Sequence, residues 1–489
     1  MHALRPLQLS LLTLLAAPAS AQSAWSADPS VNAAVSSLST NEAYDGTGPQ
    51  VIAFPDASVV VGFTVRRSTT PGDFDIFAQR LNATGKAQWQ AHGKPIAALP
   101  GSSQSGLALT ADGTGGALFA WEDDRGGDTE IYAQRVDSQG DALWTPLGVE
   151  VSASSANETA VDVLADGTGG AFLAWQGGGE ARMQRLDASG APVWAAGGIS
   201  LGSYFADSLM GVSGPFLASD GTGGVFAAWR SGNLGVSVLR FDAGGNPLWT
   251  SPTVLNQGVP HAIQMAADRT GGVLLALEEH VPLADCHVHL QRIDSSGAML
   301  YGPFSFGTEI AAEVVGSCGE IALLAPSGGT AVVAWSSFQA IRVQHLDAQG
   351  SPTWGSGGVE LCGIFEGIGS PALARGFGNT VTVTWKAGKT AEPTDILAQK
   401  LRIADGTPLW GQNGVVISSA DGHQSAPAIA YTRGNGTFNP HVLELIGLFT
   451  CVIAWNDERD GKADVYAQGI SVTGVHPPIM QPVEFATCK

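Results

Sequence analysis

The chain has 489 residues, with 24 Lys and Arg against 44 Asp and Glu, which gives a formal net charge of −20. Such an acidic surface repels phosphate backbones and anionic lipid, so nucleic acid and a membrane surface are not expected partners. Only 14% of the residues are charged and 64 are glycine, a composition typical of short strands joined by many tight turns.

Residues 1–21 carry the pattern of a secretory signal peptide. Arg5 precedes an apolar stretch at 7–17, and small residues occupy positions Ala19 and Ala21. This is the order of charge, apolar core and A-x-A cleavage site that such signals share. The apolar stretch is shorter than the roughly 20 residues that span a bilayer. We therefore expect cleavage near Ala21 and a secreted or periplasmic protein without membrane insertion.

A unit of four strand-like runs, here named strands a to d, recurs roughly every 50 to 60 residues. In one copy the runs are GLALTAD, ALFAWED, EIYAQRVD and ALWTPLGVEVS, which are rich in Val, Ile, Phe and Trp as strands are. The pair Asp112-Gly113 predicts a tight hairpin between strands a and b, because glycine accepts positive φ. A D-x-x-G spacing, as at 137–140, predicts an Asx turn with a glycine bulge between strands c and d.

All 13 tryptophans fall at two positions of this unit. Six end a strand b and six begin a strand d, while Phe63 and Leu277 fill two further b positions and Tyr301 one d position. The last copy has no strand d of its own. Eight b positions therefore match eight d positions only if Trp25 belongs to the last copy, so that residues 25–37 complete it.

Four-stranded units of this length, arranged around an axis, predict an all-β, eight-bladed β-propeller. The N-terminal strand closes the ring by pairing with the last blade, which removes an open sheet edge. The predicted boundaries are 1–21 for the signal peptide, 22–475 for the propeller and 476–489 for a C-terminal tail. Seven blades plus a separate element is the alternative, because the first copy is divergent.

The c–d segments RLDASGAPVW (185–194) and RLNATGKAQW (80–89) resemble the tryptophan-docking motif A-x-D-x-x-T-G-K-x-x-W of eight-bladed, quinoprotein-type propellers. The resemblance implies that each strand d tryptophan docks its blade on the next. Most copies depart from the motif by one residue, and the adjacent cysteine pair of the quinone enzymes is lacking, so no redox chemistry is implied. The pattern W-x-D-x-R, D-I-Y-A-Q-R-L-D and G-x-x-L-W is also similar to repeats of exported bacterial β-propeller proteins.

The loops between strands b and c vary most from copy to copy. They are long and charged in blades one, two, seven and eight, which are neighbours if the ring closes as predicted. Loops on a rigid scaffold are where binding residues concentrate, so this seam arc is a candidate contact surface for a protein or polysaccharide. Two other interpretations are that the arginines pair with acids of their own loops, or that the arc binds a cation. The candidate ligand-binding residues are Arg66, Arg67, Asp73, Asp123, Asp124, Arg125, Asp128, Asp457, Arg459 and Asp460.

Blade five contains a second candidate site in EEHVPLADCHVH (278–289). His287 and His289 lie two apart on one strand, so both imidazoles point to the same face, as metal ligands can. Across the loop, His280 extends the candidate set for a divalent metal, the one cofactor that the sequence suggests. Packed or hydrogen-bonded core histidines are the alternative. Five cysteines are too few for a disulfide scaffold, and one bridge, Cys286–Cys318, is predicted.

The sequence contains no G-x-x-x-x-G-K-[ST], H-E-x-x-H or C-x-x-C motif. An enzyme is expected to gather unrepeated polar residues at the axis end of several blades, and the sequence pattern shows such clusters only in blade five and on the seam arc. We therefore predict an exported, non-catalytic binding or interaction scaffold for a protein or polysaccharide. An extracellular glycan hydrolase or lyase is the alternative.

Overall fold

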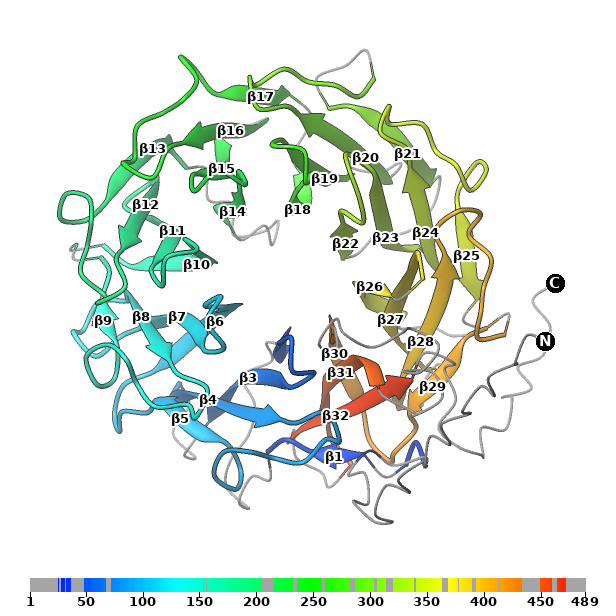
Figure 1. The fold of residues 1–489 in the computed structure, drawn as a ribbon, viewed down its shortest axis with the longest axis horizontal. Coiled ribbons are helices and arrows are strands. Elements are labelled where there is room, and N and C mark those ends of the chain that lie inside the picture. The colour runs from blue at the N-terminus through cyan, green and yellow to red at the C-terminus, as the bar shows by residue number, and fades with distance from the viewer. Residues whose placement is uncertain are drawn as a thin grey trace, which may run out of the picture.

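A computed structural model of the chain arranges eight four-stranded antiparallel sheets around a central axis (Figure 1). This confirms the all-β, eight-bladed propeller, and the alternative of seven blades is wrong. Among the described residues no helix has the length and apolar character needed to cross a membrane. The structure describes residues 25, 28–30, 32–36, 48–66, 72–152, 154, 156–204, 214–231, 235–256, 260–280, 286–302, 306–313, 320–337, 340–362, 368–376, 378–388, 393–411, 413–432, 449–459 and 464–471.

Blades one to four each follow the predicted order of strands a to d from the axis outward. Blade one holds β2 (Gln50–Ala53), β3 (Val59–Arg66), β4 (Phe74–Leu81) and β5 (Lys94–Ala97). Blade two holds β6 (Gln104–Ala111), β7 (Ala117–Asp123), β8 (Glu130–Val136) and β9 (Val149–Glu150). Blade three holds β10 (Glu158–Ala165), β11 (Ala171–Gly177), β12 (Glu180–Leu186) and β13 (Ile199–Ser203). Blade four holds β14 (Phe216–Ser219), β15 (Val225–Ser231), β16 (Gly235–Phe241) and β17 (Thr253–Asn256).

Blades five to seven repeat this order, and blade eight takes its outer strand from the other end of the chain. Blade five holds β18 (Pro260–Ala267), β19 (Val273–His280), β20 (Cys286–Ile293) and β21 (Thr308–Glu313). Blade six holds β22 (Ile321–Leu324), β23 (Ala331–Ser337), β24 (Ala340–Leu346) and β25 (Val359–Cys362). Blade seven holds β26 (Gly369–Gly376), β27 (Thr380–Gly388), β28 (Thr394–Arg402) and β29 (Val415–Ser418). Blade eight holds β30 (Gln424–Tyr431), β31 (Phe449–Asp457), β32 (Asp464–Ser471) and β1 (Ala33–Ala34).

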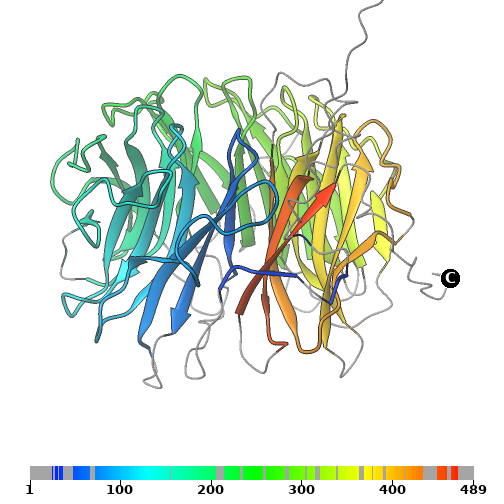
Figure 2. The same cartoon turned by 60° about the horizontal axis from the view of Figure 1, so that its bottom comes forward.

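The ring closes where the N-terminal strand pairs with the last blade. Ala33 lies opposite Ala467, and Ala34 opposite Tyr466, in an antiparallel ladder between β1 and β32. Figure 2 shows the blue N-terminal strand running across the outside of the red strands of blade eight. The predicted closure by the N-terminus is therefore confirmed, and β32 is not left as an open edge.

Aromatic residues of the outer position pack against the following blade, and in blade five this residue is Tyr301 instead of a tryptophan. The buried Trp25 donates its indole N–H to the Ala83 carbonyl of blade one at 3.1 Å. Trp144 makes the same contact with Ala188 of blade three at 3.0 Å. One detail of the sequence expectation is wrong, because Trp144 precedes β9 rather than beginning it. Its backbone N–H donates to the Gln134 side chain at 3.0 Å instead of to a ladder carbonyl.

The turn between strands c and d has the structure that its D-x-x-G spacing predicts. Asp137 accepts the backbone N–H groups of Gln139 and Asp141 on one carboxylate oxygen, each at 2.9 Å, as an Asx turn does. Gly140 has φ +77°, and a Cβ there would lie 2.9 Å from the Trp89 ring of the preceding blade. The glycine is therefore required both by the turn and by the docked tryptophan.

The b-position tryptophans form the core between blades. Trp121 is fully buried and packs in one apolar cluster with Val60 and Ile76 of blade one. Other apolar clusters join blade eight to blade one and blade seven to blade eight. Blades seven, eight, one and two are thus consecutive around the ring, which was the geometric premise of the seam arc.

Candidate functional site

The seam-arc residues of blade two form a clamp inside their own loop. Asp123 is buried, and its carboxylate accepts the Trp121 indole N–H at 2.8 Å and the Arg125 guanidinium. The guanidinium lies over the Tyr132 ring, 3.9 Å from its centroid, and donates to the Leu147 carbonyl at 3.0 Å. The W-x-D-x-R pattern therefore fixes the loop against strands b and c and against the segment that precedes β9.

Blade eight repeats this clamp at the ring seam. The buried Asp457 carboxylate accepts Trp455 Nε1 at 2.9 Å and Arg459 Nη2 at 2.6 Å. Arg459 stacks on the strand c tyrosine of its blade, 3.8 Å from the ring centroid. It also donates to the Ser30 carbonyl at 3.1 Å and to Asn32 Oδ1 at 2.9 Å. The arginine thus ties the N-terminal segment to the last blade.

The other seam-arc candidates lie apart from these clamps or outside the described residues. Asp124 is exposed and accepts the Ser103 backbone N–H at 2.6 Å, and Asp128 is also exposed. Arg66 ends β3 and Asp73 precedes β4, and both are partly buried. Residues 67 and 460, predicted as Arg67 and Asp460, lie outside the described residues. A ligand-binding role for the arc stays a prediction, whereas the arginine–acid pairing is seen directly.

A ring of polar side chains was not singled out by the sequence pattern. It occupies the position that follows the Trp, Phe or Leu near the end of strand b, and its residue type differs between most blades. All its members are buried or half-buried. They are Thr64, Glu122, Gln176, Arg230, Glu278, Ser336, Lys386 and Asn456. The signal that could have found this ring is the residue that follows the strand b Trp, Phe or Leu, which is polar in all eight copies.

One member of this ring, Glu122, borders a cavity of about 540 Å³ beside the axis. The cavity is lined by the innermost strands of five consecutive blades, β2, β6, β10, β14 and β18. Its polar lining comes from Gln50, Glu122, Asp162 and Gln264, and Phe216 is among its apolar lining residues. It lies toward the face that carries the b–c loops, since Glu122 is near the end of β7 and Gln50 begins β2.

The two carboxylates of the cavity each reach the next blade. Glu122 accepts the backbone N–H of Ala160 at 2.7 Å, where a bulge in β10 gives Ala160 a φ of +58°. Asp162 accepts the backbone N–H of Leu217 in blade four at 2.8 Å. Burial raises the pKa of Asp162 to about 6 against these hydrogen bonds, and it also raises the pKa of Glu122. Both groups can therefore gain a proton closer to neutral pH than an ordinary carboxyl.

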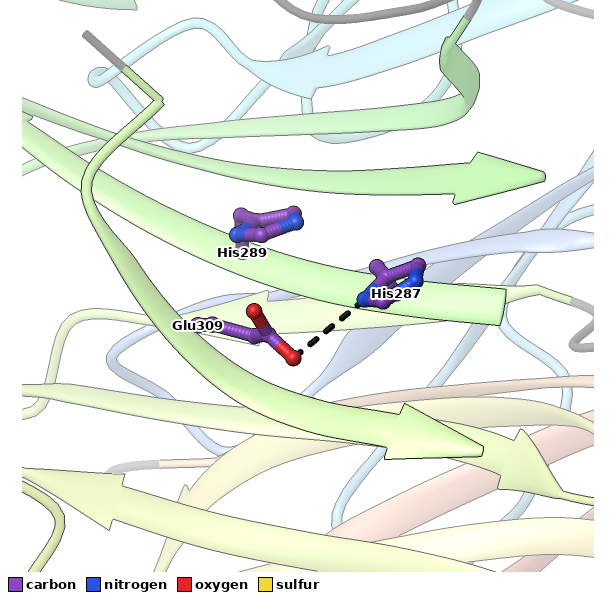
Figure 3. A group of neighbouring side chains, drawn as sticks. All are labelled: His287, His289 and Glu309. Carbon is purple, nitrogen blue, oxygen red and sulfur yellow. Dashed lines mark hydrogen bonds and ion pairs between the residues drawn. The ribbon is translucent and has the colours of Figure 1, made fainter. Parts of the chain in front are cut away.

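The blade-five cluster brings both histidines of the H-x-H pair together with a glutamate (Figure 3). His287 and His289 lie on β20, and Glu309 lies on the neighbouring outer strand β21. His287 Nδ1 is 3.2 Å from Glu309 Oε1, and one donor atom from each of the three residues lies within 4.8 Å of the others. His280 ends β19, but its side chain lies outside what the structure describes.

His289 is the buried member of the blade-five cluster. Its side chain is 2% exposed, and its Nε2 lies 4.0 Å from Glu279 Oε2. Burial lowers the pKa of His289 to about 4, although the Glu309 carboxylate opposes this effect. The ring of Phe306 packs edge-on against the imidazole, with centroids 4.8 Å apart. The predicted Cys286–Cys318 bridge stays untested, since position 318 lies outside the described residues.

No family model matches this chain, and no curated protein matches it. Among solved structures, an ulvan lyase of polysaccharide lyase family PL25 is 9% identical, with 90% of this chain and 95% of that chain covered and a TM-score of 0.43. A protein of unknown function from Dyadobacter fermentans is 12% identical, with 90% and 97% covered and a TM-score of 0.40. The Hadza microbial sialidase Hz136 is 9% identical, with 83% and 75% covered and a TM-score of 0.37. These similarities carry no argument about activity.

Proposed function

We propose that this protein is an exported, non-catalytic binding scaffold that takes a neutral polysaccharide chain at the axial cavity. The observation that carries the proposal is the polar lining of that cavity, which comes from four different blades through Gln50, Glu122, Asp162 and Gln264. The turns and the docking positions, by contrast, keep similar residue types in most blades, because the same contacts recur there. A lining whose polar residue types differ from blade to blade can match a ligand that has no rotational symmetry.

The chemistry of the cavity supports a sugar ligand. A volume of about 540 Å³ falls within the range of about 300–1,000 Å³ that is usual for ligand pockets. Carboxylate and amide groups from Glu122, Asp162, Gln50 and Gln264 can accept and donate hydrogen bonds to hydroxyls, while Phe216 offers an apolar face. The net charge of −20 disfavours a polyanionic glycan, so a neutral chain is the better fit.

One observation favours a hydrolase or lyase as the second candidate. The Asp162 carboxyl has a pKa raised to about 6 by burial, and raised carboxyls serve as general acids in glycan cleavage. Against this, Asp162 and Glu122 both accept backbone N–H groups of the adjacent blade, so each has a structural partner. A scaffold role therefore stays first.

A glycan array with the purified protein, followed by calorimetric titration of the neutral oligosaccharides that bind, tests the proposal. Gln264 lies exposed in the cavity, so Gln264→Ala should weaken binding at least tenfold without loss of folding. Gln88→Ala is the matched control, because Gln88 is exposed beside the c–d hairpin on the opposite face. Release of reducing ends from a bound glycan would establish the enzyme instead. Failure to bind any glycan, or equal binding by Gln264→Ala, would overturn the axial site.

A further inference from the structure

We propose that blade five binds a zinc ion through His287, His289 and Glu309, with Glu279 as the fourth protein ligand. The site lies on the outer strands β20 and β21 and on the end of β19. The axial cavity is lined instead by innermost strands, so the two proposals stand or fall separately.

The donor atoms are already near the spacing that zinc needs. Ligands about 2.0–2.2 Å from zinc at tetrahedral angles lie about 3.3–3.6 Å from one another. His287 Nδ1 and Glu309 Oε1 are 3.2 Å apart, which matches one edge of such a tetrahedron. The widest separation among the three donor atoms is within 4.8 Å, so rotation of the side chains can bring them into range without moving the strands.

The sheet itself fixes the direction of these side chains. His287 and His289 are two residues apart on β20, and their rings are nearly parallel, with an interplanar angle of 16°. Glu309 lies directly opposite His289 in the ladder between β20 and β21. The three ligands therefore come from two alternate positions of β20 and from the β21 residue that faces one of them, within one rigid sheet, which limits the entropy lost when an ion binds.

Comparison with blade six shows how the surroundings of the Glu309 carboxylate differ from those of the equivalent glutamate. In blade six, Glu360 occupies the ladder position of Glu309, and it pairs with the Arg342 guanidinium at 2.7 Å. In blade five the ladder partner is His289. A permanently charged group is thus replaced by a nitrogen donor, which is the exchange that a carboxylate–imidazole metal site requires.

Glu279 supplies the second carboxylate. It lies opposite His287 in the ladder between β19 and β20, and its Oε2 is 4.0 Å from His289 Nε2. Two carboxylates balance the charge of a divalent ion, and two imidazoles favour zinc over calcium, which prefers oxygen ligands alone. The side chains of Glu309 and His287 are 45% and 24% exposed, so an ion can enter from solvent.

Calorimetric titration of Zn²⁺ into the protein, prepared without a histidine tag, tests the site. We expect one ion per chain and, at zinc about 100-fold above Kd, a rise in Tm of about 3 °C. His287→Gln, His289→Gln and Glu309→Gln should each weaken binding at least tenfold. Co²⁺ should give the absorption of a four-coordinate site, and Ca²⁺ should leave Tm unchanged.

His345→Gln is the matched control, since His345 is a buried histidine of blade six whose Nδ1 lies 2.7 Å from Thr353 Oγ1. It should retain full zinc affinity. If His289→Gln does not fold, the more exposed Glu309 and His287 variants decide the matter. The proposal is overturned if zinc does not bind at one ion per chain, or if these two variants bind it as wild type does.

Discussion

Blades two and five place different chemistry on the same rungs of the same sheet. In blade two, Tyr132 lies opposite Trp121 and Glu150. In blade five, His289 lies opposite Leu277 and Glu309. In blade two, Arg125 covers the Tyr132 ring and pairs with Asp123. In blade five, two imidazoles and two carboxylates lie close together instead. Charged residues that recur with the repeat therefore hold the fold, and the departures from the repeat are where a separate function should be sought.

The largest expected effect comes from breaking the clamp at the ring seam. Asp457→Ala removes the acceptor of both Trp455 and Arg459, and it leaves a mostly buried guanidinium, 13% exposed, without its carboxylate. We predict a loss of about 3–5 kcal/mol in the free energy of unfolding, measured by urea denaturation. The N-terminal segment should also become susceptible to proteolysis, because Arg459 holds Ser30 and Asn32.

Asp128→Ala is the control for the seam clamp, because Asp128 is an exposed acid of the blade-two loop. It should leave the urea midpoint unchanged. If both variants unfold at the same urea concentration as wild type, the W-x-D-x-R pattern is not structural, and its charged residues become candidates for ligand binding again.

A smaller loss of stability is expected from alanine at the glycines that face the docked rings. It tests whether blade five docks on blade six as blade one docks on blade two. A Cβ at Gly140 would lie 2.9 Å from Trp89, and one at Gly350 would lie 2.6 Å from Tyr301. Gly113 has a similar φ of +79° but no atom within 4 Å of its Cβ position. We predict that Gly113→Ala costs about 1–2 kcal/mol through backbone strain alone.

Gly140→Ala and Gly350→Ala should each cost about 1–3 kcal/mol more than Gly113→Ala, because their Cβ atoms meet a docked ring. Thermal denaturation of the three variants measures the difference. Equal losses in all three would mean that the outer aromatic residues tolerate displacement, and that blade-to-blade docking does not depend on these turns.

The pH dependence of the free energy of unfolding should differ between two carboxyls of the polar ring, Glu278 of blade five and Glu122 of blade two. Burial, and then the Glu320 carboxylate, raise the pKa of Glu278 from 4.5 to about 7. The folded state thus holds this proton more tightly, so its contribution to stability is full below about pH 4.5 and is lost as pH rises through about 7. Glu278→Gln should remove this decline and be more stable than wild type at pH 8 by on the order of 2 kcal/mol.

Glu122→Gln should change the same pH profile less, because the Ala160 N–H stabilises the Glu122 carboxylate in its ionised form. The exposed Glu458 provides the control variant Glu458→Gln, whose profile should follow wild type. Urea unfolding between pH 4 and pH 8 measures all three. A Glu278→Gln profile that runs parallel to wild type would show that this carboxyl titrates normally in the folded protein.

The eight-bladed fold and its closure by the N-terminus were predictable from the sequence. They depend on local turns and on the number of strand b and strand d positions. The D-x-x-G spacing sets a turn by itself, and Trp25 was needed to balance eight strand b positions against eight strand d positions. The placement of Trp144 before β9 was not predictable, since its N–H bonds to a side chain, Gln134, rather than to a ladder.

The candidate site was predictable only in part. Period-two spacing put His287 and His289 on one face, but Glu309 comes from another strand, and a register shift between Val288 and His289 decides which residue faces it. A shift of this kind leaves no mark in the sequence. For Arg125, the sequence left pairing and ligand binding open, and the contact with Asp123 favours pairing.

The change in Tm on adding zinc, measured side by side in wild type, Asp123→Ala and Glu309→Gln, tests the contrast between the two blades most directly. The two blades are separate sites, so the effects of the clamp variant and of zinc should add. We predict the same rise of about 3 °C in wild type and in the less stable Asp123→Ala, and no rise in Glu309→Gln. A rise that persists in Glu309→Gln, or that is absent from wild type, would contradict a division of the repeat into structural clamps and one metal-binding blade.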